Sequence, residues 1–228
     1  MRILVIDNNI DSDSWGAANM RKFAAAHPGT TVFVRRAPQG DLPKDISSFD
    51  RIVVSGSRTS CLDDAPWISR LEQTMRKAID LGKPLLGVCY GHQVLARVLG
   101  GKENVRKGVT PEFGWAEIEV LAENPLFHGI SKKFHSFCWH YEELTRVPPG
   151  MTLLAKSATC GIQAVQLTGK PIYGIQFHPE KSLQEGESSL EEIRRDKSDR
   201  RFLLRPKDGA KLFDSKIGDS IFKNFFSL

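Results

Sequence analysis

The chain has 228 residues and a formal charge of +5, with 32 Lys and Arg against 27 Asp and Glu. Hydrophobic residues make up 40% and charged residues 26%, which is ordinary globular composition and excludes a collagenous or wholly disordered protein. The longest apolar runs, such as Leu85–Val88, fall far short of the roughly 20 residues of a membrane helix, and no basic stripe carries aromatic residues. We therefore expect no membrane and no nucleic acid as a partner.

The cysteines and the N-terminal residues indicate a cellular location. Cys61, Cys89, Cys138 and Cys160 are widely spaced and form no C-x-x-C pair. The first residues contain Asp7 directly after a short apolar run, without the long apolar stretch and small-residue cleavage site of a secretion signal. We expect reduced thiols and a cytoplasmic protein.

The first half of the chain predicts strands that alternate with helices. Apolar or β-branched runs predict strands at 2–6, 31–35, 51–55 and 85–88. Helical spacing predicts helices at 15–27, 66–81 and about 91–99. Such alternation implies right-handed crossovers and a mostly parallel sheet with helices on both faces, so the predicted fold class is α/β.

The second half has a different pattern. Strand-like runs at 116–121, 151–155, 163–167 and 171–177 are expected to add antiparallel strands, and His135 to His140 falls in an expected loop. A charged segment at about 185–213 is expected to be a surface excursion, either a solvated helix and loop or a segment that docks a partner or covers a site. Residues 214–228 return to helical spacing, and 1–228 is expected to form a single domain.

A cysteine lies between two glycines, directly after an apolar strand and directly before a helix. Gly87, Cys89 and Gly91 fit the G-x-nucleophile-x-G elbow with Cys in place of Ser. The glycines are needed because neighbouring side chains would collide in so tight a turn, and a helix N-terminus favours the reactive thiolate. A cysteine at the end of a buried strand is also a common core residue, so the pattern alone leaves both interpretations open.

A second strand ends at a histidine with a carboxylate two positions further on. His178 and Glu180 would lie with Cys89 at the carboxyl edge of one sheet, where open α/β sheets place their sites. A thiolate nucleophile needs a base that moves protons and a third group that fixes the tautomer of this base. The three residues supply these groups and together predict nucleophilic catalysis.

The two motifs resemble those of a known family. Cys89–Gln93 (CYGHQ) with Phe177–Glu180 (FHPE) is similar to the class I, triad-type glutamine amidotransferases, most closely to the glutaminase domain of GMP synthetases. The similarity continues through Glu112–Ala116, Asn124–Phe127 and Tyr173–Gln176 and covers roughly residues 1–182. The fold expected for such a chain is flavodoxin-like.

The resemblance implies a reaction and a partner. Cys89 would attack the side-chain amide of L-glutamine and form a γ-glutamyl thioester, with ammonia passed to a separate synthetase. His178 would protonate the leaving nitrogen and then activate water, while Glu180 holds the imidazole. The oxyanion would accept hydrogen bonds from the backbone N–H groups of Tyr90 and Ser57, and removal of one such donor typically costs roughly 100- to 1,000-fold in rate.

No cofactor or metal is expected. The histidines form no H-E-x-x-H motif, and no cysteine pair has zinc spacing. A Walker A loop and a Rossmann G-x-G-x-x-G motif are both absent, so no bound nucleotide is expected.

Two stretches depart from the family pattern. The loop Ser55–Arg58 stands where the family usually has Ser-Gly-Gly-Pro, so either the N–H of Ser57 is presented by another route or the oxyanion hole forms only when something binds. Gly56 beside it, and Gln93, which matches a family glutamine, are expected to contact the substrate. Cys138–Glu142 stands where GMP synthetases show Ser-His-Gly-Asp.

The aromatic residues of that second stretch leave the pocket open to interpretation. Trp139 and His140 are expected to bind substrate by comparison with the family. The bulk of Trp139 is either simple packing or a sign of a pocket for a different γ-glutamyl group, as in the stand-alone γ-glutamyl peptidases that this stretch also resembles.

Three functions remain open at this point. The first is a glutaminase that supplies a separate synthetase, because the Ser-Gly-Gly-Val-Asp-Ser loop of a synthetase ATP site does not occur in this chain. The second is a γ-glutamyl peptidase that uses the same three residues on another γ-glutamyl compound. The third is a non-catalytic binding or regulatory module of the same fold.

Overall fold

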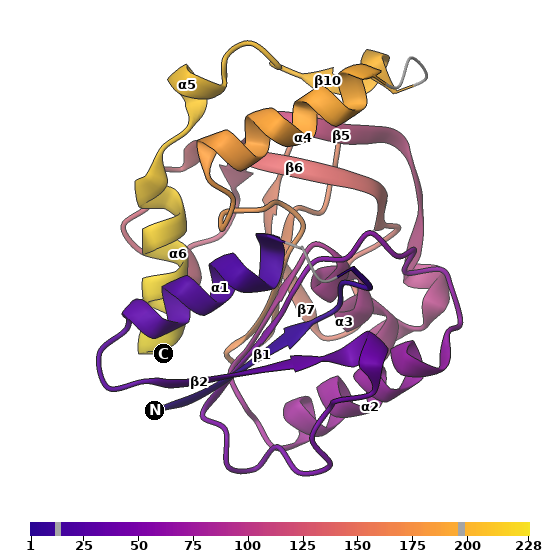
Figure 1. Cartoon of the computed structure of the whole chain (residues 1–228), viewed down its shortest axis with the longest axis vertical. Helices are drawn as coiled ribbons and strands as arrows, with labels where there is room; N and C mark the ends of the chain where they lie inside the picture. Colours follow the sequence, from indigo (N-terminus) through magenta and orange to yellow (C-terminus); the bar gives the residue numbers. More distant parts are fainter. Residues whose placement is uncertain (12–14, 196–198) are drawn as a thin grey trace.

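The computed structural model describes residues 1–11, 15–195 and 199–228 (Figure 1). Its first half contains β1 (Arg2–Asp7), α1 (Trp15–Ala26), β2 (Thr31–Arg36), β3 (Arg51–Val54), α2 (Pro66–Asp80), β4 (Leu85–Val88) and α3 (Tyr90–Gly100). Its second half contains β5 (Val105–Val120), β6 (Lys133–Leu144), β7 (Met151–Lys156), β8 (Ala164–Leu167), β9 (Ile172–Ile175), α4 (Leu183–Arg195), β10 (Leu203–Leu204), α5 (Gly209–Leu212) and α6 (Ser215–Ser227). Short 3₁₀ turns lie at Ala37–Gln39, Lys102–Asn104, Pro125–Phe127 and Arg200–Phe202.

The strands of the described residues form one mixed sheet of ten strands. Its parallel part has the order β2-β1-β3-β4-β9, with each neighbouring pair in parallel register. The antiparallel strands β8, β7 and β5 continue the sheet from β9, and β6 pairs with β5 outside this path. The predicted α/β class, the flavodoxin-like fold and the added antiparallel strands are therefore confirmed.

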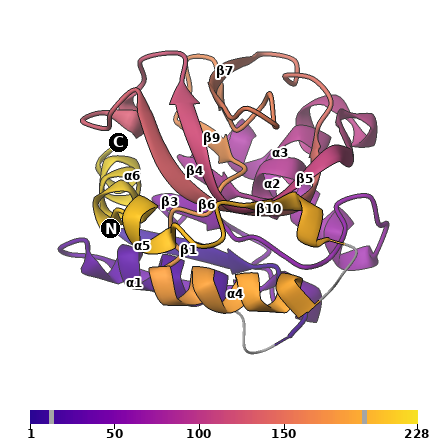
Figure 2. The same ribbon diagram turned by 90° about the horizontal axis from the view of Figure 1, so that it is seen from above.

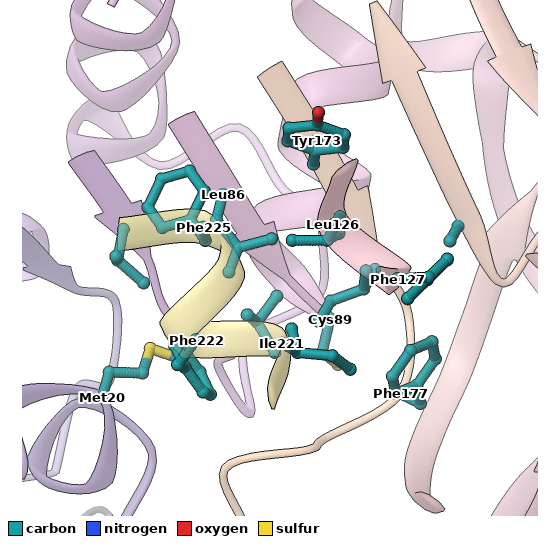
Figure 3. Packing of buried hydrophobic residues seen from close by; sticks show 14 of the residues in the cluster. Met20, Leu86, Cys89, Leu126, Phe127, Tyr173, Phe177, Ile221, Phe222 and Phe225 are labelled. Atoms are coloured by element: carbon teal, nitrogen blue, oxygen red, sulfur yellow. The ribbon is translucent and has the colours of Figure 1, made fainter. Parts of the chain in front are cut away.

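Alternate residues of the central strands supply the two apolar faces. Ile3 and Val5 belong to the buried cluster that holds α1 and α6, whereas Leu4 and Ile6 belong to the cluster that holds α2 and α3. Figure 1 shows the same division, with these two pairs of helices on opposite faces of the sheet. Figure 3 shows part of the first cluster, which reaches from Met20 of α1 to Cys89 at the end of β4.

The expected loop at His135 to His140 is a correction, because these residues lie inside β6. The inward positions of this strand include His140 and Glu142 as well as Phe134 and Cys138, all of them buried. A strand with ionisable residues on its buried face lacks the apolar alternation from which strands are predicted. The partners that satisfy these polar groups come from distant parts of the chain, and the sequence does not reveal them.

The charged segment at 185–213 combines a helix with a short strand. Leu190 of α4 packs with Trp115 of β5 and Phe137 of β6 in a buried cluster, so α4 covers these two strands (Figure 2). After α4, β10 pairs with β5 in parallel, with Leu204 opposite Gly114. Among the described residues, no helix is both long and apolar enough to cross a membrane.

Candidate active site

The turn after β4 has the geometry of a nucleophile elbow. Cys89 has φ 51° and ψ −101°, a left-handed backbone conformation that is strained for a residue with a side chain. A Cβ on Gly87 would lie 2.5 Å from the carbonyl oxygen of Gly91, and a Cβ on Gly91 would lie 2.4 Å from that of Val54. Glycine is therefore required at both positions because backbone segments pass too close for any side chain.

His178 and Glu180 reach the same edge of the sheet because β9 is the parallel neighbour of β4. The imidazole Nδ1 lies 2.7 Å from Glu180 Oε1, and both side chains are buried. The other side of the imidazole hydrogen bonds to the side chain of Cys89. The sulfur of Cys89 also lies 3.7 Å from the carbonyl oxygen of Trp139. The three residues that the sequence singles out therefore form one hydrogen-bonded series.

The surroundings of His178 favour its protonated form. Burial lowers the pKa of His178, but the charges of Glu180 and Cys89 and the hydrogen bonds to both outweigh burial and raise this pKa to about 9. A protonated imidazole next to a sulfur nucleophile is the form that donates a proton to a leaving amine.

Two backbone N–H groups flank the sulfur of Cys89. Among the described residues, neither the N–H of Ser57 nor that of Tyr90 donates a hydrogen bond. Gly56 lies against the pair, since a Cβ there would be 3.1 Å from the imidazole of His178 and 3.6 Å from the Cβ of Cys89. Two donors beside a nucleophile suit the stabilisation of a tetrahedral oxyanion.

Of the expected substrate-binding residues, Trp139 lines the cleft beside Cys89, but Gln93 and His140 are engaged in hydrogen bonds. The Gln93 amide donates to the carbonyl oxygen of Glu142 at 3.0 Å and to the side chain of Gln176 at 3.2 Å. His140 Nδ1 lies 3.1 Å from the same carbonyl oxygen. Their role in substrate binding stays a prediction, and the structure adds a role in holding β6 against α3.

A buried network centred on Glu112 is not predicted from the sequence. The carboxylate accepts hydrogen bonds from the side chains of His140 at 2.9 Å, Ser157 at 2.6 Å and Gln163 at 2.6 Å, and from Thr159. Burial raises the pKa of Glu112, but these hydrogen bonds and the positive charge of His140 outweigh it and bring the pKa down to about 2. Glu112 is therefore an ionised carboxylate in the protein interior.

This network also fixes the protonation of His140. One ring nitrogen faces the Glu112 carboxylate and the other faces the carbonyl oxygen of Glu142, and both of these groups are acceptors. Both ring nitrogens therefore donate, and His140 is an imidazolium that pairs with Glu112.

Glu112, Cys138 and His140 lie close enough together to be examined as metal ligands, with ligand atoms within 4.8 Å of one another. Burial holds the pKa of the Cys138 thiol well above its usual value, which opposes the thiolate that a metal needs. Four donors already occupy the Glu112 carboxylate. The donor set fits a hydrogen-bond network and does not fit a metal site.

Lys181 is a second buried ionisable residue that is not predicted from the sequence. Its side chain is 3% exposed, its ammonium donates to Ser189 Oγ at 2.5 Å, and it lies 4.5 Å from the centre of the Phe137 ring and 5.4 Å from that of Trp139. Burial lowers the pKa of Lys181 to about 7. The only signal in the sequence is its place next to Glu180.

Replacing Lys181 by methionine is expected to remove a pH dependence of stability. The pKa of Lys181 lies below its value in the unfolded chain, so the unfolded chain binds more protons between the folded pKa of about 7 and the usual value of 10.5. The unfolding free energy of the wild type should therefore rise with pH in this window, by at most about 1.4 kcal/mol per pH unit from this group. Urea unfolding of wild type and Lys181→Met at several pH values measures the difference, and parallel curves would contradict the expectation.

Two cavities meet at Cys89. One has a volume of about 850 Å³ and is lined by residues that include Cys89, His178, Gly56 and Ser189. The other has a volume of about 740 Å³ and is lined by residues that include Cys89, Gln93, Leu62 and Tyr141. Ser57, Arg58 and Trp139 line both cavities, so a substrate bound at Cys89 has space on two sides.

The fold and the three aligned side chains define a class of protein, and a comparison of families agrees with it. The family model described as glutamine amidotransferase class-I matches residues 10–194. The chain belongs to this family, so the resemblance of its two motifs is confirmed.

Curated relatives match a part of the chain. Over 97 residues it is 45% identical to a subunit of the glutamine-hydrolyzing GMP synthase of Thermococcus kodakarensis, which covers 42% of this chain and 50% of that protein. Over 137 residues it is 33% identical to the subunit of the same name from Saccharolobus solfataricus, covering 60% of this chain and 70% of that protein. The chain thus spans about half the length of the first of these relatives.

Solved structures share the fold. A glutamine amidotransferase from Thermotoga maritima has a TM-score of 0.80 at 20% identity, with 100% of this chain and 96% of that chain covered. A glutamine amidotransferase from Methylobacillus flagellatus has a TM-score of 0.79 at 22% identity, with 99% of this chain and 94% of that chain covered.

Proposed function

We propose that this protein hydrolyses the side-chain amide of L-glutamine through a γ-glutamyl thioester on Cys89. The observation that supports this most is the hydrogen-bonded series of Cys89, His178 and Glu180 with two unused backbone donors beside the sulfur. Family membership and the names of the relatives point to the same reaction.

The steps follow from the positions of the groups. The sulfur of Cys89 attacks the amide carbon, and the oxyanion accepts hydrogen bonds from the N–H groups of Ser57 and Tyr90. His178 gives its proton to the leaving nitrogen, ammonia departs, and the thioester remains. His178 then takes a proton from water, which attacks the thioester and releases glutamate, while Glu180 keeps the imidazole oriented.

We propose that the ammonia passes to a separate synthetase, in a cytoplasmic complex. The support is that several relatives are named as one subunit of GMP synthase. The four cysteines, all in the described part of the chain, are unpaired, as expected in a reducing compartment. We further propose that residues 1–228 act as a single domain, because strands from both halves share one sheet.

The larger cavity favours a second candidate, the hydrolysis of γ-glutamyl amides with bigger leaving groups. His178 lines the cavity of about 850 Å³, so the leaving nitrogen has to point into that cavity. A water-sized molecule such as ammonia needs only about 30 Å³. A γ-glutamyl peptide would place its second amino acid in this space.

The deciding experiment measures glutamate release by the isolated protein from L-glutamine and from a γ-glutamyl dipeptide, with Cys89→Ala as the blank. Turnover of glutamine at least as fast as that of the dipeptide supports the amidotransferase. Much faster turnover of the dipeptide supports the second candidate. Release from neither substrate, with or without a candidate synthetase in the reaction, would leave the third possibility, a non-catalytic module.

A further inference from the structure

The loop that carries the Ser57 N–H is tied to the end of β1. Ser57 Oγ donates to the carbonyl oxygen of Asn8 at 2.8 Å and accepts from the N–H of Thr59 at 3.0 Å. Asn8 is itself held by Ser55, with its N–H 3.0 Å from Ser55 Oγ and its side-chain amide 2.8 Å from the Ser55 carbonyl oxygen. Asn8 and Ser55 are fully buried, so the anchor is rigid.

The far end of the same loop is tied to β6. The carboxylate of Glu142 accepts hydrogen bonds from the hydroxyl of Ser60 and, at 2.8 Å, from the N–H of Cys61. On the outside, Arg58 forms an ion pair of 3.0 Å with Glu192 of α4, which is exposed on both sides and contributes little. Residues 55–61 are thus fixed at both ends before any ligand arrives.

From these contacts we propose that the hydroxyl of Ser57 is a positioning group that holds its own backbone N–H ready for the oxyanion. This inference rests on the proposed function. Where the family usually has a glycine and a proline, this chain has Ser57 and Arg58, and the two hydrogen bonds of the Ser57 hydroxyl take over the restraint that the proline ring would supply. The oxyanion hole is therefore formed in the isolated chain and does not wait for a partner.

The test compares Ser57→Ala, Ser57→Gly and Ser57→Thr, with Ser47→Ala as the matched control. Ser47 also donates a hydroxyl hydrogen bond, to Asp45 in an exposed loop far along the chain from the site. Ser57→Ala and Ser57→Gly are expected to lower kcat roughly 10-fold with little change in KM, which is less than the roughly 100- to 1,000-fold cost of deleting an oxyanion donor. Ser57→Thr keeps the hydroxyl and should restore kcat, and Ser47→Ala should match the wild type.

A second readout does not depend on turnover. The Thr59 amide hydrogen should exchange with solvent roughly 10-fold faster in Ser57→Ala and at the wild-type rate in Ser57→Thr, because the hydrogen bond to Ser57 Oγ protects it. Wild-type kcat in Ser57→Ala, or an equal loss in Ser57→Thr, would overturn the proposal. Unchanged Thr59 exchange in Ser57→Ala would overturn it as well. If the wild type releases no glutamate, the proposed function fails, and the exchange data alone decide whether the hydroxyl holds the loop.

Discussion

Replacing Cys89 by alanine is expected to lower the rate of glutamate release by roughly 10⁴- to 10⁶-fold, the range seen when the nucleophile of a hydrolytic triad is removed. The reason is that the thioester can form only on this sulfur, which lies at the elbow within hydrogen-bond reach of His178. Stopped reactions of the wild type, analysed by mass spectrometry, should contain protein that carries one γ-glutamyl group, and Cys89→Ala should contain none.

Cys160→Ala is the matched control for this prediction. Cys160 is also a buried, unpaired cysteine, but its sulfur lies 3.7 Å from the carbonyl oxygen of Ile162 and is not part of the series at His178. Its replacement should leave kcat close to that of the wild type. Activity that persists in Cys89→Ala would refute the thioester mechanism and leave only water as the nucleophile.

The largest effect on stability is expected from Glu112→Gln. The substitution removes the charge that pairs with His140 and turns an acceptor towards side chains that donate to it. Removing one partner of a buried ion pair typically costs about 3–5 kcal/mol, a large part of the stability of a domain. Urea unfolding at pH 7 would measure the loss.

The same pair of proteins predicts a pH dependence. The pKa of Glu112 is lowered from 4.5 to about 2, so its contribution to stability is fully present above pH 4.5 and is lost as the pH falls through about 2. The difference in unfolding free energy between the wild type and Glu112→Gln should therefore narrow over this range. Glu117→Gln, on the same strand but in an exposed ion pair with Lys133, serves as the control and should unfold almost like the wild type. A similar small effect in both variants would contradict the role given to the buried network.

Local patterns of the sequence are enough to predict the parallel half of the sheet and the positions of the three residues at its edge. The strands β1, β3 and β4 are short apolar runs, and the glycines around Cys89 mark the elbow, because tight backbone contacts leave no room for other residues. His178 and Glu180 follow a strand, and parallel neighbours end at one edge. These features depend on near neighbours in the chain, so spacing and residue type reveal them.

Only the tertiary structure decides the features that depend on distant partners. Glu112 and His140 look like surface residues in the sequence, and their burial becomes favourable only when Ser157, Gln163 and the Glu142 carbonyl oxygen surround them. Likewise, Ser57 differs from the family pattern in the sequence, whereas its contact with Asn8, 49 residues away, gives the difference a purpose. A buried polar group is stable only with its partners in place, and the sequence alone does not show which residues the fold brings together.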